Sequence, residues 1–333
     1  MSTMREKMAE FVCELQDEIV SALEALDSSA QLFLRDAWER PQGGSGKSCV
    51  FSCQTPTSIL EKAGVNVSLV HGTLPPAAMK QMRADHTTIP LPEDQDGGLP
   101  FYAAGVSLVI HPRNPHAPTV HANYRYFEIT SPSGELLAWW FGGGSDLTPS
   151  YLYEEDAVHF HSTLKSACDT HGTLLYPAFK KWCDEYFHIT HRGESRGLGG
   201  IFFDDLHDGE HQRIPSSGDR PRTADEIFAF IQSAGRAFLP SYLPILSKRH
   251  AIPYTDHQRR WQLLRRGRYV EFNLVIDRGT KFGLMTPGAR IESILMSLPE
   301  SARWEYMSDL GQDEDSEEGK ILKVLKQPRE WVK

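Results

Sequence analysis

Cysteine is scarce in this chain of 333 residues, and its five cysteines are scattered. None of them forms a CxxC pair, so their spacing favours reduced, buried thiols over a disulfide framework or a zinc knuckle. These thiols are Cys13, Cys49, Cys53, Cys168 and Cys183.

An excess of basic residues is also missing. The formal net charge is −9 and the sequence pI is about 5.9, which argues against a nucleic-acid partner or an anionic membrane surface. No run approaches the roughly 18 consecutive apolar residues of a membrane span, so we expect a soluble protein. The N-terminus is rich in acids, unlike a signal or transit peptide, and favours a cytoplasmic location: Glu6, Glu10, Glu14, Asp17 and Glu18.

The chain begins with a segment of helical periodicity. Apolar residues recur at helical spacing from Met8 to Leu26, which predicts an amphipathic helix. The segment from Pro41 to Ser48 ends like a phosphate-binding P-loop. However, proline replaces the first glycine of that motif, and strand-like residues follow where a helix is required. We therefore predict a flexible connector there.

The remaining pattern predicts strands first and helices afterwards. Strands are expected at 48–54, 65–71, 103–111, 121–130 and 136–141, with short links that favour an antiparallel meander. Helices are expected at 154–170, 176–187, 223–242, 256–265 and near 290–298, with one more strand at 268–276 and polar loops at 207–222 and 311–318. This layout predicts an α+β fold, in which a large antiparallel sheet lies between layers of helices and residues 1–333 form a single domain.

Polar groups gather on one face of two neighbouring predicted strands. Residues two apart share a face, so His121, Asn123 and Arg125 lie together, with Tyr124 on the opposite side. The preceding strand places Ser107 on one face with Val109 and His111. A solvent-facing sheet surface is the alternative, but such surfaces usually carry Thr, Lys and Glu.

The last predicted strand repeats this arrangement. Glu271, Asn273 and then Asp277 share one parity, while the other parity is apolar from Val270 to Ile276. Asp277 ends the strand, where it is either a functional carboxylate or a turn-capping residue.

Histidine is abundant, with fourteen residues, so a metal site has to be considered. His159 and His161 are two apart on a predicted helix and point in different directions, unlike the pair in HExxH. A metal site formed by histidines that are distant in sequence remains open, because such residues can converge in the fold. The candidates for such a site are His111, His121, His161 and His191.

The most specific string is WWFGGGSDLTP at 139–149, which places three glycines between an aromatic strand end and an expected helix. Such a backbone turns sharply or approaches something large and flat. Other long strings are EDAVHFH at 155–161, YPAFKKWCD at 176–184, HRGESRGLGGIFFDDL at 191–206, RGRYVEFN at 266–273, DRGTKFGL at 277–284 and TPGARIESILMS at 286–297. Together they resemble the oxygen-dependent coproporphyrinogen III oxidase family, over roughly residues 5 to 333.

The resemblance implies an enzyme of haem biosynthesis. Members of this family convert two propionates of coproporphyrinogen III to vinyl groups, giving protoporphyrinogen IX, with molecular oxygen as co-substrate and carbon dioxide and hydrogen peroxide as products. They are described as homodimers with a broad antiparallel sheet between helical layers, and as needing no organic cofactor. An electron-rich pyrrole can itself reduce oxygen, which leaves the protein to bind, orient and move protons.

The resemblance also implies roles for individual residues. Arg125 would bind a substrate carboxylate, His121 would donate a proton, and Asp277 would accept a pyrrole N–H proton or stabilise the cationic ring. Contacts with the substrate are expected from Ser107, Asn123, Tyr124, Arg125, Gly288, Ala289 and Arg290. No metal is expected. The alternatives are an oxygenase with a metal bound by the four histidines above, and a non-catalytic tetrapyrrole-binding protein.

Overall fold

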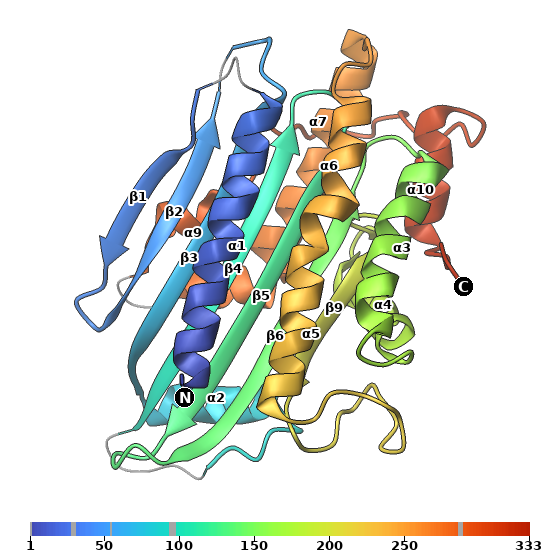
Figure 1. The fold of residues 1–333 in the computed structure, drawn as a ribbon. Coiled ribbons are helices and arrows are strands. Elements are labelled where there is room, and N and C mark those ends of the chain that lie inside the picture. Colours follow the sequence, from blue (N-terminus) through green and yellow to red (C-terminus); the bar gives the residue numbers. More distant parts are fainter. Residues whose placement is uncertain (1, 28–30, 54, 93–97, 286–288) are drawn as a thin grey trace.

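A seven-stranded antiparallel sheet forms the centre of the structure, a computed structural model that describes residues 2–27, 31–53, 55–92, 98–285 and 289–333. The strands follow the order β1-β2-β3-β4-β5-β6-β9 across the sheet (Figure 1). They are β1 (Leu34–Glu39), β2 (Gly44–Ser52), β3 (Leu60–Leu74), β4 (Leu99–Pro112), β5 (Thr119–Thr130), β6 (Leu136–Thr148) and β9 (Gly200–Leu206). A small second sheet pairs β7 (His188–Ile189) with β8 (Glu194–Ser195). The predicted antiparallel meander is confirmed.

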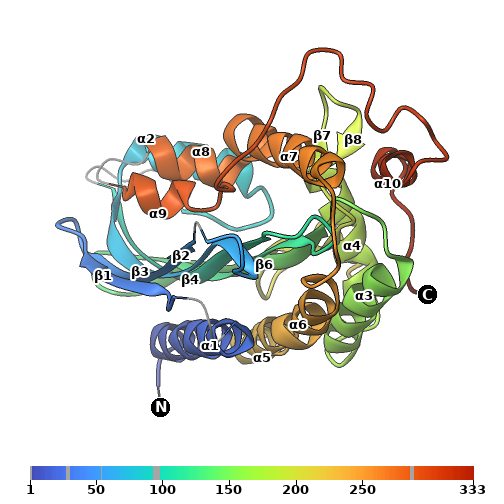
Figure 2. The same cartoon turned by 90° about the horizontal axis from the view of Figure 1, so that it is seen from above.

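Helices cover both faces of the large sheet, as Figure 2 shows. One layer consists of α1 (Met4–Leu26), α5 (Ala224–Arg236) and α6 (Phe238–Arg249). The other consists of α2 (Pro76–Asp85), α7 (Asp256–Glu271), the π-helical turn η1 (Phe272–Ile276), α8 (Arg278–Met285) and α9 (Ile291–Leu295). Beside β9 lie α3 (Glu154–Asp169) and α4 (Leu175–Tyr186), and α10 (Glu317–Lys326) contacts β8. The predicted α+β class is therefore confirmed.

The N-terminal helix forms as its apolar spacing predicts. A capping box begins it, in which Thr3 and Glu6 satisfy each other's backbone N–H groups. Its apolar face is buried in the main core, and Gln16 donates hydrogen bonds to the carbonyls of Lys47 and Val65 at 2.8 and 2.7 Å. The helix is thus tied to β2 and β3 by both packing and hydrogen bonds.

The segment from Pro41 to Ser48 is not a flexible connector. Gly44–Ser52 is strand β2, which pairs with both β1 and β3. Gly43 and Gly44 have φ of 113° and 99°, a left-handed conformation that favours glycine, and they make the turn between β1 and β2. The glycines that resemble a phosphate loop therefore serve a hairpin.

The predicted strand at 268–276 is also wrong. Helix α7 begins with a capping box at Thr255 and continues to Glu271, and η1 follows directly. Arginines on different sides of α7 each reach a carboxylate from another element: Arg266 pairs with Glu61 on β3 and Arg265 with Glu194 on β8. These long-range ion pairs outweigh the local preference of alternating apolar residues for a strand.

Two further boundaries differ from the prediction. The helix expected at 223–242 is divided into α5 and α6 at Ala237, because Pro240 has no N–H to continue the α5 hydrogen-bond ladder. Strand β6 does not end at Phe141 but runs through the three glycines to Thr148. The sequence also left β1, α2, β9, α8 and α10 unpredicted.

The cysteines and the hydropathy agree with the sequence analysis. All five cysteines are free thiols, and all except the half-buried Cys13 are buried. Burial raises the pKa of Cys168 and of Cys183. Within the described residues, no helix has the length and apolar character to cross a membrane.

Candidate active site

The polar face of β5 exists as the alternation predicts. His121, Asn123 and Arg125 are half-buried on the side of the sheet that carries α7, α8 and α9, and the residues between them are buried on the other side. The register places Asn123 opposite the exposed Ser107 on β4 and opposite Gly144 on β6. Ser107 is thus brought to the same strip of sheet.

Tyr124 has its side chain on the opposite face of the sheet. It is fully buried, and its hydroxyl donates to the carbonyl of Ala234 on α5 at 2.9 Å and lies 2.8 Å from the hydroxyl of Ser145. Burial raises the pKa of this phenol. The structure therefore does not bring the Tyr124 side chain together with His121 and Arg125.

Arg125 is held by two hydrogen bonds from its guanidinium. Nη1 donates to Oδ1 of Asn123 at 2.8 Å, and Nη2 donates to Oδ2 of Asp204 on β9 at 2.7 Å. The guanidinium crosses β6 at Gly142, where an added Cβ would lie 2.7 Å from Nη2 and 2.4 Å from Oδ1 of Asp204. With 36% of the side chain exposed, Arg125 keeps donors for a ligand.

Glycines leave this part of the sheet without projecting side chains. Arg125 lies between Gly105 on β4 and Gly142 on β6, and Asn123 lies beside Gly144. The three glycines of β6 therefore lie within a strand and do not turn the chain. Gly142 and Gly144 leave a flat strip of sheet with few side chains beside Arg125, whereas Gly143 lies opposite Tyr124 and faces the other side.

His121 belongs to a buried ionic network. Its Nδ1 lies 2.7 Å from Oδ1 of Asp146, the residue directly opposite on β6, and Oδ2 of Asp146 accepts from Nη2 of Arg196 at 2.7 Å. Burial raises the pKa of Asp146, but the Arg196 guanidinium and His121 outweigh it and hold this pKa below 3.8. Asp146 is therefore ionised, and it fixes the orientation of the His121 ring.

Aromatic rings surround the cation of this network. The Arg196 guanidinium lies 4.1 Å from the ring centre of Phe187, 4.5 Å from that of Tyr269 and 4.9 Å from that of Phe272. Its Nη1 also donates to Asn273 on η1 at 3.0 Å. Arg196 thus connects the sheet to α7 and η1, and it does so out of contact with solvent.

Asp277 lies on the other side of this strip, at the end of η1. Its Oδ2 accepts from the backbone N–H of Thr280, so it caps α8 as the alternative interpretation predicted. Its Oδ1 accepts from the hydroxyl of Tyr186 at 2.8 Å, and Tyr186 stacks on Phe202 with 4.0 Å between ring centres. Burial and then Asp277 raise the pKa of this phenol, while Arg278 and Arg125 act to lower it. Tyr186 therefore orients Asp277 and lies within range of the Arg125 charge.

Of the predicted contacts at 288–290, Arg290 lies near β1 rather than beside Arg125. Gly288 is outside the described residues, and Ala289 is half-buried. Arg290 forms an ion pair with Asp36 on β1 and lies 5.8 Å from the ring centre of Trp38. The register aligns Asp36, Ser48, Asn66, Ser107 and Asn123 in one row across five strands. Arg290 and Arg125 thus flank the same surface from two sides.

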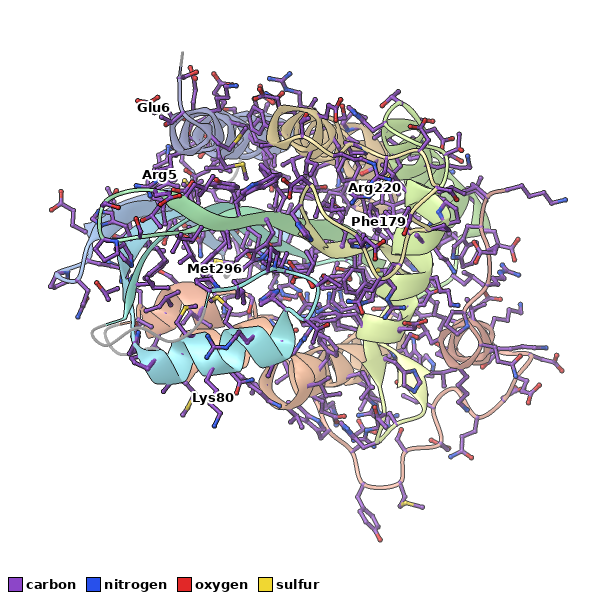
Figure 3. All side chains as sticks on the ribbon, turned by 90° about the horizontal axis from the view of Figure 1, so that it is seen from below. Arg5, Glu6, Lys80, Phe179, Arg220 and Met296 are labelled. Atoms are coloured by element: carbon purple, nitrogen blue, oxygen red, sulfur yellow. The ribbon has the colours of Figure 1, made fainter. Side chains whose placement is uncertain are left out.

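Helix α9 covers the part of that row between the two arginines that lies on β2 and β3. Ser293 contacts Ser48 at 3.0 Å through its hydroxyl and accepts from Asn66 at 2.8 Å through its carbonyl. Met296, labelled in Figure 3, points at the sheet, and a Cβ on Gly64 would lie 1.8 Å from its sulfur. The uncovered strip therefore lies on β4 to β6, between α9 and Tyr186.

The four candidate histidines have separate surroundings. His111 is buried between Thr119 and the Ser297 carbonyl, His161 contacts Tyr176 and the Leu198 carbonyl, and His191 pairs with Glu271. Burial holds the pKa of His111 far below 6.5 and that of His161 at about 3. In the described ranges, the one group of three potential metal ligands is His86, Asp204 and Asp205, which includes none of the four.

Comparison with known proteins agrees with this geometry. The family model described as coproporphyrinogen III oxidase matches residues 7–331. The chain belongs to this family. A Drosophila melanogaster protein named oxygen-dependent coproporphyrinogen-III oxidase is 56% identical over 99% of this chain and 78% of its own length. A mitochondrial Homo sapiens protein of the same name is 55% identical over 99% and 68%, and a chloroplastic Glycine max protein is 51% identical over 99% and 80%.

Several site residues of this family member escaped the sequence analysis. Asp146, Arg196 and Asp204 lie within the strings that carried the resemblance, and Tyr186 lies between two of them, but no role was assigned to any of these residues. The prediction that β6 ends at Phe141 left Asp146 outside the strand, although Asp146 is the cross-strand partner of His121. Nothing in the local sequence indicates the contacts of Asp204 with Arg125 or of Tyr186 with Asp277.

Proposed function

We propose that this chain catalyses the oxygen-dependent oxidative decarboxylation of two propionates of coproporphyrinogen III, giving protoporphyrinogen IX in haem biosynthesis. Each propionate carboxylate leaves as carbon dioxide while the side chain gives up a hydride equivalent. With one proton, that hydride reduces molecular oxygen to hydrogen peroxide, so two oxygen molecules serve one substrate. The family membership and the flat cationic strip support this proposal together.

The observation that carries the proposal is the half-exposed Arg125 on a surface kept flat by glycine. A tetrapyrrole is broad and carries carboxylates at its rim, so it needs a low surface with cations beside it. A charge-assisted hydrogen bond from Arg125 to a propionate would contribute about 1.5–3 kcal/mol. Arg290, at the other end of the same row, is placed to bind a second carboxylate if it leaves Asp36.

His121 is the proton donor in this proposal. Its Nδ1 is held by Asp146, which leaves Nε2 as the ring nitrogen that can exchange a proton with substrate or oxygen. Asp146 and Arg196 fix the ring without contacting solvent themselves. Their part is to orient His121.

Asp277 is the carboxylate that accepts a pyrrole N–H proton or stabilises the cationic ring. Tyr186 and the first turn of α8 orient it, because each donates to one of its two oxygens. Replacement of Asp277 by alanine is expected to lower turnover by on the order of 10²–10³. Loss of the helix cap costs stability as well, by about 1 kcal/mol.

Substrate contacts complete the proposed site. Ser107 and Asn123 offer a hydroxyl and an amide on the strip, and Gly288, Ala289 and Arg290 are the further proposed contacts. Tyr124 takes part only through the main chain of β5, because its side chain lies across the sheet. No organic cofactor or metal is proposed, since the electron-rich pyrrole supplies the electrons.

Two finer parts of the proposal concern assembly and location. We propose a homodimer, and the edge strand β1 with the exposed side chains of Leu32 and Leu34 is the surface that supports it. Sedimentation equilibrium tests this. We also propose a cytoplasmic location. The Homo sapiens and Glycine max relatives are named mitochondrial and chloroplastic, so cell fractionation has to decide.

The deciding experiment uses chelator-treated protein incubated with coproporphyrinogen III in air and under argon. Protoporphyrin fluorescence is measured after the products are oxidised. Product in air alone supports the proposed oxidase. Product that appears only after a metal is restored favours the histidine-metal oxygenase, and substrate bound but unchanged in every arm favours the carrier.

A further inference from the structure

Asp204 is the feature of the site that no step of the proposed reaction uses. It lies at the end of β9 with 14% of its side chain exposed, and it accepts from Arg125 through Oδ2. Its other oxygen accepts from the backbone N–H of Asp205 at 3.1 Å. Both oxygens of Asp204 are therefore engaged. A negatively charged Asp204 side chain would also repel the carboxylates of the substrate. Asp204 is thus unsuited to bind the substrate directly.

The guanidinium of Arg125 needs such a partner. An arginine side chain has four rotatable bonds, and a carboxylate is bound well only when the planar guanidinium is held in one orientation. Asn123, on the same strand, supplies one hydrogen bond, and Asp204 supplies the second from β9. Two bonds from two strands fix the plane and leave three of its five N–H donors for a ligand.

Gly142 makes the contact between these two residues possible. A methyl group there would lie 2.4 Å from Oδ1 of Asp204 and 2.7 Å from Nη2 of Arg125, both closer than van der Waals contact permits. The strand between the two partners therefore has no side chain where the ion pair crosses it.

The end of α2 holds Asp204 in turn. Asp205 adopts φ of 55°, a left-handed conformation that is rare outside glycine, and its side chain is buried. Its Oδ1 lies 2.5 Å from Nδ1 of His86, the residue that ends α2, and its Oδ2 lies 3.4 Å from the hydroxyl of Thr88. The His86 ring also packs 4.8 Å from the ring centre of Trp140 on β6. His86 and Thr88 therefore hold the residue next to Asp204 in place.

We infer that Asp204 is a positioning residue for Arg125, which holds the guanidinium in the orientation that binds a propionate carboxylate of the substrate. The inference rests on the proposed function. Asp204 acts through Arg125, and the segment from His86 to Thr88 holds Asp204 through Asp205.

The first test compares two substitutions of Asp204. In Asp204→Ala the guanidinium loses its second anchor, and kcat/KM is expected to fall by roughly 10²-fold, mostly through KM. In Asp204→Asn the amide oxygen still accepts from Nη2, so kcat/KM should stay within about tenfold of the wild type. Binding of coproporphyrin III, the stable oxidised tetracarboxylate, is measured by calorimetry and should weaken in parallel.

The second test is a double-mutant cycle with Arg125→Ala. If Asp204 acts only through Arg125, Asp204→Ala costs no further kcat/KM in that background. Gly142→Ala should reproduce the loss while both charged residues remain. Asp156→Asn is the matched control, because it alters a buried carboxylate that pairs with Arg249 on α6 and not with Arg125, and should lower Tm without the loss in kcat/KM.

Three outcomes would overturn the inference. They are wild-type kcat/KM in Asp204→Ala, an equal loss in Asp204→Asn and Asp204→Ala, and losses that add in the double-mutant cycle. A wild-type protein without activity would instead contradict the proposed function. In that case coproporphyrin III binding still tests whether Asp204 supports the carboxylate site.

Discussion

Replacing Asp146 by asparagine removes the charge that connects His121 to Arg196. Asp146 and Arg196 each expose 2% of the side chain, so the substitution leaves a guanidinium buried without its counter-charge. Removing one partner of a buried ion pair costs about 3–5 kcal/mol. The amide oxygen still accepts one hydrogen bond and the three aromatic rings remain, so we expect a loss near the lower limit, about 3 kcal/mol.

Two measurements follow from this change. At roughly 2 °C for each kcal/mol in a large domain, Tm should fall by about 6 °C in differential scanning calorimetry. Turnover of coproporphyrinogen III should fall more steeply, by on the order of 10²-fold, because asparagine no longer fixes the tautomer and orientation of the His121 ring. Steady-state kinetics in air at a temperature well below the lowered Tm separates the second effect from the first.

A second buried ion pair provides the control. Asp156 on α3 accepts from Nε and Nη2 of Arg249 on α6 at 2.7 and 2.9 Å, and both side chains are buried. Asp156→Asn should lower Tm comparably and leave kcat within about twofold of wild type, because Glu155 and not the active site shares this arginine. Equal turnover in the two variants would refute the role given to the Asp146 contact with His121.

The pH dependence of this pair has a definite sign. The pKa of Asp146 is below 3.8 in the folded protein, so its contribution to stability is complete above the unfolded pKa. That contribution is lost as the pH falls through the lower folded pKa. The stability difference between wild type and Asp146→Asn should therefore be constant from pH 5 to 7 and shrink below pH 3.8. A difference that instead grows in acid would contradict the assigned charge state.

Three further predictions concern other parts of the molecule. Arg125→Ala should lower kcat/KM by about 10²–10³ in the same steady-state assay with little change in Tm, because a half-exposed side chain contributes mainly to binding. Hydrogen bonds from Arg192, His191 and Trp304 outweigh burial and lower the pKa of Glu271 to about 2, so its stabilising contribution is present above pH 4.5 and lost toward pH 2. About 2 kcal/mol of that loss should be absent from Glu271→Gln when urea titrations at pH 3 and 7 are compared. Burial and then Lys180 lower the pKa of His161 to about 3, so His161→Gln should remove a loss of stability below pH 6.5 while activity stays insensitive to chelators.

Local periodicity predicted the parts of the site that depend on a single strand. The alternation of β5 placed His121, Asn123 and Arg125 on one face, and the register confirms this because side-chain direction alternates in any extended chain. The same argument failed at 268–276, where alternation is equally clear. There the partners of α7 lie far away in the chain, at Glu61 and Glu194, and nothing near residue 270 indicates them.

Pairings across strands were the second limit. A bulge between Ile129 and Thr130 shifts the β5–β6 register by one residue. Counting back from the turn at 131–134 would therefore pair His121 with Ser145 instead of Asp146. A second irregularity, between Phe141 and Gly143, changes the β6–β9 pairing where Asp204 meets Arg125. Such shifts arise from packing of the whole sheet, and a single sequence does not reveal them.

The glycines of β6 show why a large, flat ligand could be predicted from the sequence while the contacts that build the site could not. From sequence, three glycines before an aspartate indicated a turn or a close approach to something flat. The structure supports the second physical reason within a strand, because Gly142 admits the Arg125 guanidinium and Gly144 keeps the surface beside Asn123 low. A large flat ligand and a cross-strand ion pair both require that these positions have no side chain. Substitutions at Gly142 should therefore impair substrate binding and Arg125 together, and no variant there can separate the two.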